Sequence, residues 1–293
     1  MDFEPYINKV PINKGWSEDK KYCVTTSDGT KYLLRISQIE KYERKKFEYE
    51  ILEEVALLGV PICRPVDFGI CDEGVFALHS WIEGEDAEDR IPSLPKGQQY
   101  EYGIKAGKIL KQIHSIPAPI TQEDWNVRFN RKIDTKIMNY NNCPIKYDGG
   151  NAFIDYINAN RHLLKTRPQS FQHGDYHIGN MMISQDELVI IDFNSCDYGD
   201  PWEEFNRIVW CAQASPLFAS GMLEGYFDHQ VPIEFWKLLA LYISNNTLSS
   251  IPWAINFGQQ EIDTMIRQAQ EVLKWYDNMQ NSVPSWYGGL GEL

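Results

Sequence analysis

Two short apolar runs, residues 180–183 and 188–191, constrain this chain more than any other feature. The three polar residues Gln, Asp and Glu lie between them, and the pattern predicts a β-hairpin. Asp175 and Asn180 stand just before or at the start of the first run, and Asp192 follows the second. Because a hairpin brings the start of one strand beside the end of the next, we expect these three side chains at one rim.

A rim with two carboxylates and an amide suits phosphoryl transfer. In that reaction the protein does little covalent chemistry. It needs one carboxylate to orient a nucleophilic hydroxyl, plus an Asn and an Asp to hold magnesium ions, which prefer oxygen ligands. The sequence therefore predicts Asp175 as the catalytic residue and Asn180 and Asp192 as the magnesium ligands.

The histidines of the same stretch allow another interpretation. His173, Asp175 and His177 alternate as metal ligands might, which would indicate a zinc or iron hydrolase. That interpretation leaves the two predicted magnesium ligands without a role. We favour structural histidines whose ring nitrogens hold carbonyl groups of the loop.

The letters HGDYHIGN, IDF and GDP carry a family resemblance. A catalytic Asp followed five residues later by a metal-binding Asn, with a second metal-binding Asp beyond, is the protein-kinase pattern. The chain resembles the aminoglycoside phosphotransferase and choline-kinase group of small-molecule kinases, and Asp175, Asn180, Asp192 and residues 199–201 match its motifs. The resemblance implies ATP, or GTP, as donor, Mg²⁺ as cofactor, and a nucleoside triphosphate and a small-molecule hydroxyl acceptor as partners.

The resemblance also implies the fold. It is an α+β, protein-kinase-like two-lobed fold, with a mainly β N-terminal lobe and a larger helical C-terminal lobe. We expect the nucleotide-binding lobe at residues 1–83. The helical lobe, with the catalytic and metal-binding loops and the substrate site, is expected at residues 84–293. At the hinge between them, the backbone groups of Ser80 and Ile82 would read the adenine.

The first lobe supplies a candidate phosphate-binding residue. An Asp-Gly pair predicts a hairpin between strands at residues 22–26 and 31–36. Alternation along the second strand places Arg35 on the face opposite Leu34, where it can point into a cleft. The resemblance implies that Arg35 replaces the lysine with which kinases hold the α- and β-phosphates, and Arg keeps that charge. The alternative is a surface arginine on an edge strand.

Two more nucleotide contacts follow from the resemblance. A Gly-Trp-Ser sequence that ends at Ser17 takes the place of the loop over the phosphates. The helical pattern of residues 43–58 corresponds to the helix whose glutamate pairs with Arg35. Glu48 fits that position best and Glu50 is the second choice, although most glutamates on such a helix merely face solvent.

The rest of the chain is predicted to be helical. Residues 121–165 resemble a helical insertion over the substrate side, and His114 fits a helix C-terminus without a chemical role. Asp200 is expected to brace the catalytic loop through hydrogen bonds. Apolar periodicity predicts further helices at residues 202–213, 232–246 and 259–278.

Charge and cysteine content restrict partners and location. The 28 basic and 41 acidic residues give a net charge of −13, which disfavours nucleic acid or an anionic membrane as a partner. The six cysteines form no CxxC pair, as expected for reduced thiols. The start of the chain carries no basic and apolar leader, and no apolar stretch is long enough to cross a membrane. These features favour a cytoplasmic protein.

The acceptor is the least constrained part of the prediction. The net charge, with Asp197, Glu203 and Glu204, favours a cationic acceptor, and Trp202 and Trp253 could enclose it or belong to the core. An antibiotic such as an aminoglycoside is therefore preferred. A metabolic kinase for choline, a sugar or homoserine shares every motif. A nucleotide-binding pseudokinase is the alternative of another class, and the intact aspartates and asparagine argue against it.

Overall fold

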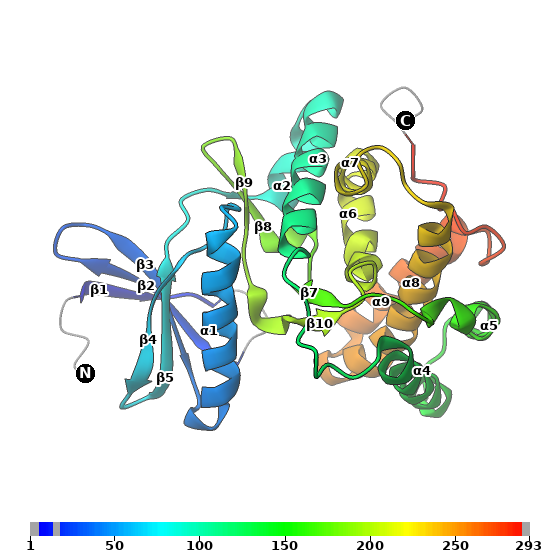
Figure 1. Cartoon of the computed structure of the whole chain (residues 1–293), viewed down its shortest axis with the longest axis horizontal. Coiled ribbons are helices and arrows are strands. Elements are labelled where there is room, and N and C mark those ends of the chain that lie inside the picture. The colour runs from blue at the N-terminus through cyan, green and yellow to red at the C-terminus, as the bar shows by residue number, and fades with distance from the viewer. Residues whose placement is uncertain (1–5, 14–17, 289–293) are drawn as a thin grey trace. The chain divides into compact units, whose positions relative to one another are not determined.

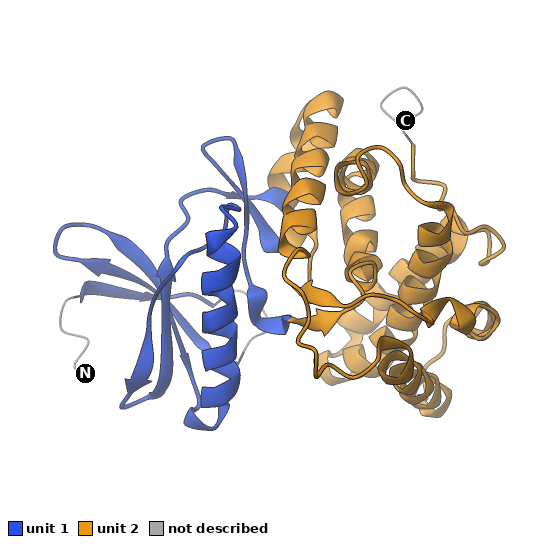
Figure 2. Ribbon diagram, viewed as in Figure 1, with its two compact units in different colours: residues 1–87, 180–196 blue, residues 88–179, 197–293 orange. Residues whose placement is uncertain are grey.

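The computed structural model describes residues 6–13 and 18–288, which belong to two compact units (Figures 1 and 2). Unit 1 comprises Met1–Ala87 and Asn180–Cys196, and unit 2 comprises Glu88–Gly179 and Asp197–Leu293. The segment with the predicted metal ligands, which the sequence analysis assigns to the helical lobe, thus belongs to unit 1. The lobe boundary after residue 83 stays a prediction.

Unit 1 contains a five-stranded antiparallel sheet of order β1-β2-β3-β5-β4, with α1 (Tyr42–Leu57) packed against β4 and β5 (Figure 1). The strands are β1 (Tyr6–Pro11), β2 (Lys20–Thr26), β3 (Lys31–Ser37), β4 (Pro65–Cys71) and β5 (Gly74–Ser80). The predicted turn joins β2 to β3, with Gly29 in the left-handed region at φ 86°. This sheet and the helices described below confirm the predicted α+β class.

One face of the sheet carries a small apolar core. Val24, Leu34, Ile36, Phe76 and Leu78 form it, all nearly inaccessible to solvent. Because side chains alternate along a strand, burying the even-numbered residues of β3 turns its odd-numbered residues to the other face. The predicted orientation of β3 is therefore confirmed, and its arginine lies on the side away from this core.

A second, three-stranded sheet of unit 1 has the order β6-β8-β9. Its strands are β6 (Glu85–Asp86), β8 (Met181–Ser184) and β9 (Glu187–Ile190). Gln185 and Asp186 join β8 to β9 with φ 50° and 63°, as a tight hairpin turn of primed type requires. The predicted hairpin is confirmed.

Unit 2 is largely helical, with one short antiparallel strand pair, β7 (Ser170–Gln172) and β10 (Asp197–Gly199). The α-helices after β6 are α2 (Ala87–Arg90), α3 (Lys96–Ile113), α4 (Trp125–Asn142), α5 (Gly150–Asn160), α6 (Ile208–Ala214), α7 (Pro216–Tyr226), α8 (Ile233–Ala254) and α9 (Gln259–Trp275). Short 3-10 helices along the chain are η1 (Ile39–Lys41), η2 (Ile91–Ser93), η3 (Arg161–Leu164), η4 (Ile178–Asn180), η5 (Phe193–Ser195), η6 (Glu203–Arg207) and η7 (Ile255–Phe257). Within the described residues, no helix has the length and apolar character to span a bilayer.

The largest differences from the predicted helices are at α7 and α8. Periodicity does not predict α7, because nine of its eleven residues are buried and the helix therefore lacks the polar face that periodicity detects. α8 continues to Ala254, beyond the predicted end at residue 246, and contains Pro252 near its last turn. Buried Ser, Asn and Thr residues after its first three turns interrupt the apolar pattern without interrupting the helix.

Glycines allow α3 and α7 to approach closely. Gly103 and Gly107 on α3 face Gly221 and Gly225 on α7. A Cβ atom on Gly107 would overlap the carbonyl oxygen of Met222, which is backbone and cannot turn aside. The helix pair therefore needs glycine at these positions.

This contact yields a stability prediction. Gly107→Ala is expected to lower the free energy of unfolding by about 2–3 kcal/mol, because the helices must separate to accept the methyl group. Gly97→Ala on the same helix meets no atom within 4 Å and should be neutral, or stabilise by about 0.5–1 kcal/mol through helix propensity. Urea unfolding of both variants measures the difference. Equal stabilities would contradict the tight helix contact.

Candidate active site

The loop after β7 holds Asp175 in a fixed position in unit 2. Gly174 adopts φ 83°, and its N–H donates to the Glu204 carboxylate at 3.0 Å. The N–H of Tyr176 donates to the same carboxylate at 3.3 Å, and that of Asp175 donates to His173 Nδ1 at 3.2 Å. Glu204 is 2% exposed. Hydrogen bonds to Glu204 and His173 therefore fix the loop backbone, while one-third of the Asp175 side chain stays exposed.

The Asp175 carboxylate has two cationic or polar neighbours. Arg207 Nε lies 3.1 Å from its Oδ1, and His177 Nε2 lies 3.5 Å from its Oδ2. Burial raises the pKa of Asp175, but the hydrogen bond from His177 and the charge of Arg207 outweigh it and hold that pKa below its usual value. The carboxylate is ionised at neutral pH, and it can accept a hydrogen bond from a hydroxyl group.

The two histidines of the loop accept hydrogen bonds from its backbone. His173 is fully buried and accepts the N–H of Asp175, and His177 Nδ1 accepts the N–H of Gly179 at 3.1 Å. The predicted structural role is thus confirmed, although the ring nitrogens accept N–H groups where carbonyl contacts were expected. Across the described part of the chain, no three His, Cys, Asp or Glu side chains are grouped to hold a metal ion.

Asp200 braces the strand pair that leads into the loop. It is fully buried, and Arg167 donates to its two oxygens at 2.7 and 2.9 Å. The Tyr242 hydroxyl donates to it at 2.5 Å and the N–H of Trp202 at 3.0 Å. Its own carbonyl accepts the side chain of Gln172 on β7 at 2.8 Å. A structural role for Asp200 is confirmed, but its hydrogen bonds hold Arg167, Tyr242, Trp202 and Gln172, whereas the predicted bracing of the loop around Asp175 comes from Glu204 and His173.

The acidic residues proposed for a cationic acceptor are engaged with other groups. Asp197 pairs with Arg128 at 3.1 Å, and Glu203 pairs with Lys132 at 3.2 Å. Glu204 is the buried brace of the catalytic loop, a role that sequence analysis missed because a glutamate after Gly-Asp-Pro carries no signal of what it accepts.

The two tryptophans proposed to enclose the acceptor, Trp202 and Trp253, contact other side chains. The Trp202 ring lies 3.7 Å from the guanidinium carbon of Arg167 and makes edge contacts with Phe227 and Phe235. Trp202 is partly buried and packs against these rings, which favours the alternative of a role in packing. Trp253 is 41% exposed, and its ring lies 4.5 Å from that of Phe257.

In unit 1, the β8–β9 hairpin brings Asn180 and Asp192 to the same end. The N–H of Ile191 donates to the carbonyl of Asn180 at 3.0 Å. Asp192 has φ 67° and ψ 60°, a left-handed conformation that aspartate adopts more readily than most other non-glycine residues. This conformation and the hairpin place the two predicted magnesium ligands together.

The donor atoms of this hairpin end suit Mg²⁺, which prefers carboxylate and amide oxygens. Arg35 Nη1 lies 3.2 Å from Asp192 Oδ1, and the Asn194 side-chain amide donates to the same oxygen. Both contacts use Oδ1, which leaves Oδ2 for a metal ion. The Asp192 side chain is 40% exposed, so an ion can reach it.

Arg35 lies in a charged network of which the sequence analysis missed Asp19, Ser37 and Lys45. Its Nη2 donates to Asp19 at 3.2 Å, and Asp19 also accepts from Lys45 at 3.0 Å and Ser37 at 2.8 Å. Burial raises the pKa of Asp19, but Lys45, Ser37 and Arg35 outweigh it and lower that pKa to about 2. Arg35 is 11% exposed at its side chain, which excludes the alternative of a freely solvated surface arginine.

Glu48 takes part in the same network through a different partner from the predicted one. Glu48 pairs with Lys45 at 2.9 Å and with Arg44 at 2.7 Å, whereas Arg35 pairs with Asp19 and Asp192. The link from Arg35 to Glu48 therefore runs through Asp19 and Lys45. Glu50 is exposed and pairs with Lys46 at 3.6 Å, so it faces solvent.

Comparison with known families decides the class of the protein. A model described as the phosphotransferase enzyme family matches residues 10–236. The chain belongs to this family. It is an ATP-dependent phosphotransferase acting on hydroxyl groups, of the small-molecule kinase type. No curated protein sequence matches it.

Solved structures of similar fold include antibiotic kinases. Aminoglycoside phosphotransferase APH(4)-Ia, solved with ADP and hygromycin B, is 13% identical with a TM-score of 0.66, over 92% of this chain and 94% of that one. Aminoglycoside 2'-phosphotransferase-IIIa with GDP is 14% identical with a TM-score of 0.67, over 94% of each chain. Amicoumacin kinase hAmiN, with AMP-PNP, Ca²⁺ and its ligand, is 14% identical with a TM-score of 0.64, over 94% and 90%. They show that this phosphotransferase has the predicted kinase-like fold.

The predicted hinge of the phosphotransferase is only partly available to a nucleotide. The N–H of Ser80 donates to the carbonyl of Arg64 at 2.8 Å, and its hydroxyl accepts the N–H of Arg64 at 2.8 Å. Ile82 lies after the end of β5 and is the better candidate for reading the base. The predicted phosphate contact Ser17 lies outside the described residues.

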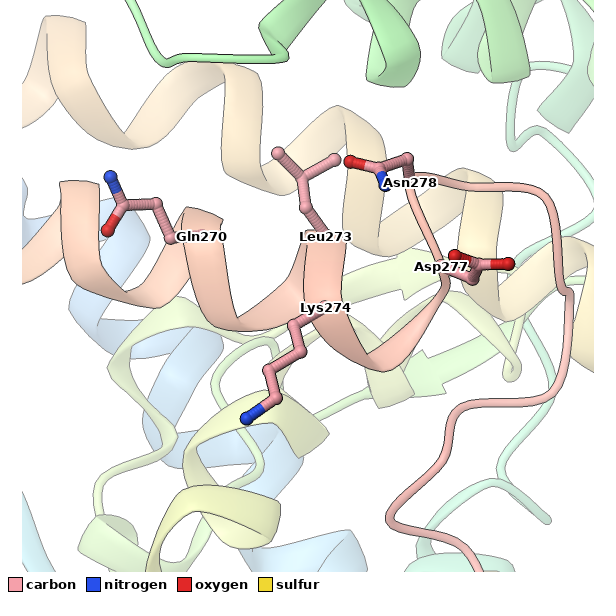
Figure 3. Close-up of a pocket in the computed structure, with 5 residues that line it drawn as sticks. All are labelled: Gln270, Leu273, Lys274, Asp277 and Asn278. Carbon is pink, nitrogen blue, oxygen red and sulfur yellow. The ribbon is translucent and has the colours of Figure 1, made fainter.

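A hollow on unit 2 of the phosphotransferase carries none of the motif residues. It measures about 430 Å³ and lies over the end of α9 and the turn that follows (Figure 3). Figure 3 shows Leu273 and Lys274 pointing to different sides of the helix. Its lining residues are Gln270, Leu273, Lys274, Asp277 and Asn278. They include no nucleophile and no group placed for phosphoryl transfer, so we assign it no part in the reaction.

Proposed function

We propose that the protein transfers the γ-phosphoryl group of ATP, or of GTP, to a hydroxyl group of a small molecule. Asp175 orients the acceptor hydroxyl and accepts its proton. Arg35 neutralises phosphate charge. The observation that carries this proposal is the ionised, one-third exposed carboxylate of Asp175 on a loop whose backbone is fixed by Glu204 and His173.

We propose Asn180 and Asp192 as the residues that hold Mg²⁺. The metal supplies charge neutralisation at the transferring phosphoryl group when it is bound. The oxygen donors of both residues and their position at one hairpin end support this role. Glu48 and Lys45 support Arg35 through Asp19, and Ile82, Ser80 and Ser17 remain proposed nucleotide contacts.

The acceptor class is open between an antibiotic and a metabolite. The structural neighbours solved with hygromycin B, kanamycin, spectinomycin and amicoumacin support an antibiotic. The electrostatic argument for a cationic antibiotic is weak, because Asp197, Glu203 and Glu204 are engaged elsewhere. The presence of all three proposed catalytic and metal-binding residues speaks against a pseudokinase.

The proposed setting is a reducing, cytoplasmic one with no nucleic acid or membrane as partner. All six cysteines are free thiols, which supports a reducing compartment. The net charge of −13 supports the absence of nucleic acid and anionic membrane among the partners.

Nucleotide turnover against a panel of acceptors tests the proposed function. The panel holds aminoglycosides, macrolides, choline and neutral and charged sugars, each assayed with ATP and with GTP. We expect acceptor-dependent release of nucleoside diphosphate, with the phosphorylated acceptor detected by mass. Nucleotide binding without any phosphorylated acceptor would favour the pseudokinase instead.

The metal assignment gives a second prediction. Asp192→Ala is expected to raise the magnesium concentration needed for half-maximal activity by about tenfold or more, because a direct oxygen ligand is lost. Titrating magnesium at fixed nucleotide measures this shift. Glu187→Gln, which removes an exposed carboxylate at the other end of the same hairpin, is the matched control and should leave the titration unchanged. An unchanged titration for Asp192→Ala would show that this residue is not a metal ligand.

A further inference from the structure

Two lysines of α4 lie on the side of the helix where Glu203 lies. Lys132 and Lys136 are four residues apart, so their side chains leave the helix on one face. Lys132 Nζ lies 3.2 Å from Glu203 Oε1. Glu203 is held in turn by Gln172 on β7, which donates to its other oxygen at 3.3 Å. This face of α4 is thus connected to the elements that carry the catalytic loop.

Lys136 differs from Lys132 in having no carboxylate partner. Its side chain is partly buried, and no hydrogen bond or ion pair joins its ammonium to any other described residue. Burial, together with the charges of Lys132 and Arg207, lowers the pKa of Lys136 to about 7, and the charge of Glu203 offsets only part of this shift. An unpaired, partly buried cation costs free energy, and an anion from outside would remove that cost.

The charges around Lys136 extend to the catalytic residue. Arg207, which lowers the pKa of Lys136, is the residue whose Nε lies 3.1 Å from Asp175. In this cluster the carboxylate of Glu203 neutralises Lys132 and that of Asp175 neutralises Arg207. Among the described residues, the ammonium of Lys136 is left without a neutralising carboxylate. The Arg207 side chain is 34% exposed and that of Asp175 is 33% exposed, so both are open to a ligand.

We propose that Lys136, in the same cluster of charges as Arg207, forms an anion subsite for the acceptor, so that the small molecule carries a carboxylate or phosphate group besides the hydroxyl to be phosphorylated. The inference rests on the proposed function, because it takes Asp175 as the residue that faces the acceptor. Lys136 would hold the anionic end of the acceptor and so restrict the rotation of its hydroxyl group relative to Asp175. This restriction favours phosphoryl transfer. A carboxylate and a phosphate share this recognition by charge and hydrogen-bond acceptors.

A first experiment tests the subsite without turnover. The protein is labelled with carbon-13 at the lysine Cε, and the Lys136 resonance is identified by its loss in Lys136→Arg. Its titration midpoint is then measured in sodium sulfate and in sodium chloride of equal ionic strength. We expect sulfate to raise the midpoint by about one pH unit, as an opposite charge nearby does. Equal midpoints in the two salts would overturn the subsite.

A second experiment identifies the class of acceptor. Phosphoryl transfer is measured with matched sugars on one pyranose scaffold: glucuronate, glucose 6-phosphate, glucose and glucosamine, together with the antibiotics of the wider panel. We expect turnover with an acidic member, and comparison of glucuronate with glucose 6-phosphate distinguishes a carboxylate from a phosphate. Turnover confined to cationic or neutral acceptors would overturn the inference while leaving the proposed function intact.

Variants connect the two experiments. Lys136→Gln should raise KM for the acidic acceptor by about tenfold, leave KM for the nucleotide unchanged and affect kcat less. Lys136→Arg should restore part of that loss. Arg131→Gln removes an exposed cation from the same helix, paired with Glu123 at 2.6 Å, and should change neither constant. An equal KM for Lys136→Gln and the wild type would overturn the inference. If no acceptor is phosphorylated, the proposed function fails, and the sulfate titration alone still decides the subsite.

Discussion

Asp175→Asn is expected to lower the rate of phosphoryl transfer by about 10² to 10⁴-fold while nucleotide binding persists. The asparagine keeps the size of the side chain but cannot accept the proton of the acceptor hydroxyl. Single-turnover phosphoryl transfer and a separate nucleotide-binding titration measure the two effects. A variant that keeps more than roughly a tenth of the wild-type rate would show that Asp175 is not the catalytic residue.

The control for this variant is Asp197→Asn. Asp197 lies on β10 in the same unit and pairs with Arg128, but its side chain is 62% exposed. Removing its charge should change the rate by less than about twofold, because exposed ion pairs contribute little. A similar loss in both variants would point to a general electrostatic effect and away from a specific role for Asp175.

Asp200→Ala is expected to lower the free energy of unfolding by about 3–5 kcal/mol, because it leaves the guanidinium of Arg167 without its partner. Arg167 is 11% exposed and Asp200 is fully buried, so water cannot replace the lost carboxylate. The Tyr242 hydroxyl loses its acceptor as well. Such a loss is a large part of the stability of a typical protein. Urea unfolding, followed by fluorescence and circular dichroism, measures it.

An exposed ion pair in the same unit is the comparison for that measurement. Asp228 pairs with Lys111 at 2.5 Å, and both side chains are at least half exposed. Asp228→Asn, which suits the left-handed backbone at φ 50°, should leave the urea midpoint nearly unchanged. If the two variants lose equal stability, the buried cluster at Asp200 is not the brace that its hydrogen bonds indicate.

The parts of the site that were predictable are those that short-range sequence order determines. The β8–β9 hairpin follows from two apolar runs with a polar turn between them, and this hairpin alone brings Asn180 beside Asp192. The side of β3 on which Arg35 lies follows from strict alternation along a strand. The roles of these residues remain predictions, because family motifs suggested them and the fold by itself does not test them.

The parts that could not be predicted depend on contacts between distant segments. Nothing in the letters around Glu204 indicates that its carboxylate accepts backbone N–H groups 30 residues earlier. Asp19, which directly precedes β2, likewise meets Lys45 of α1 only when the chain is folded. The acceptor could not be predicted for the same reason. The net charge of a chain does not reveal that Lys132 neutralises Glu203, or that Lys136 forms no ion pair with a carboxylate among the described residues.

The division of the chain into units limits how evolution and protein engineering can exchange its parts. Unit 1 needs Asn180–Cys196, a segment encoded inside unit 2, so the chain passes between units three times, after residues 87, 179 and 196. A gene fragment that ends at residue 87 encodes the five-stranded sheet without the proposed metal ligands. Recombination between relatives at a single crossover near residue 87 would pair one parent's sheet with the other parent's hairpin. Chimeras that keep a matched lobe therefore require three junctions.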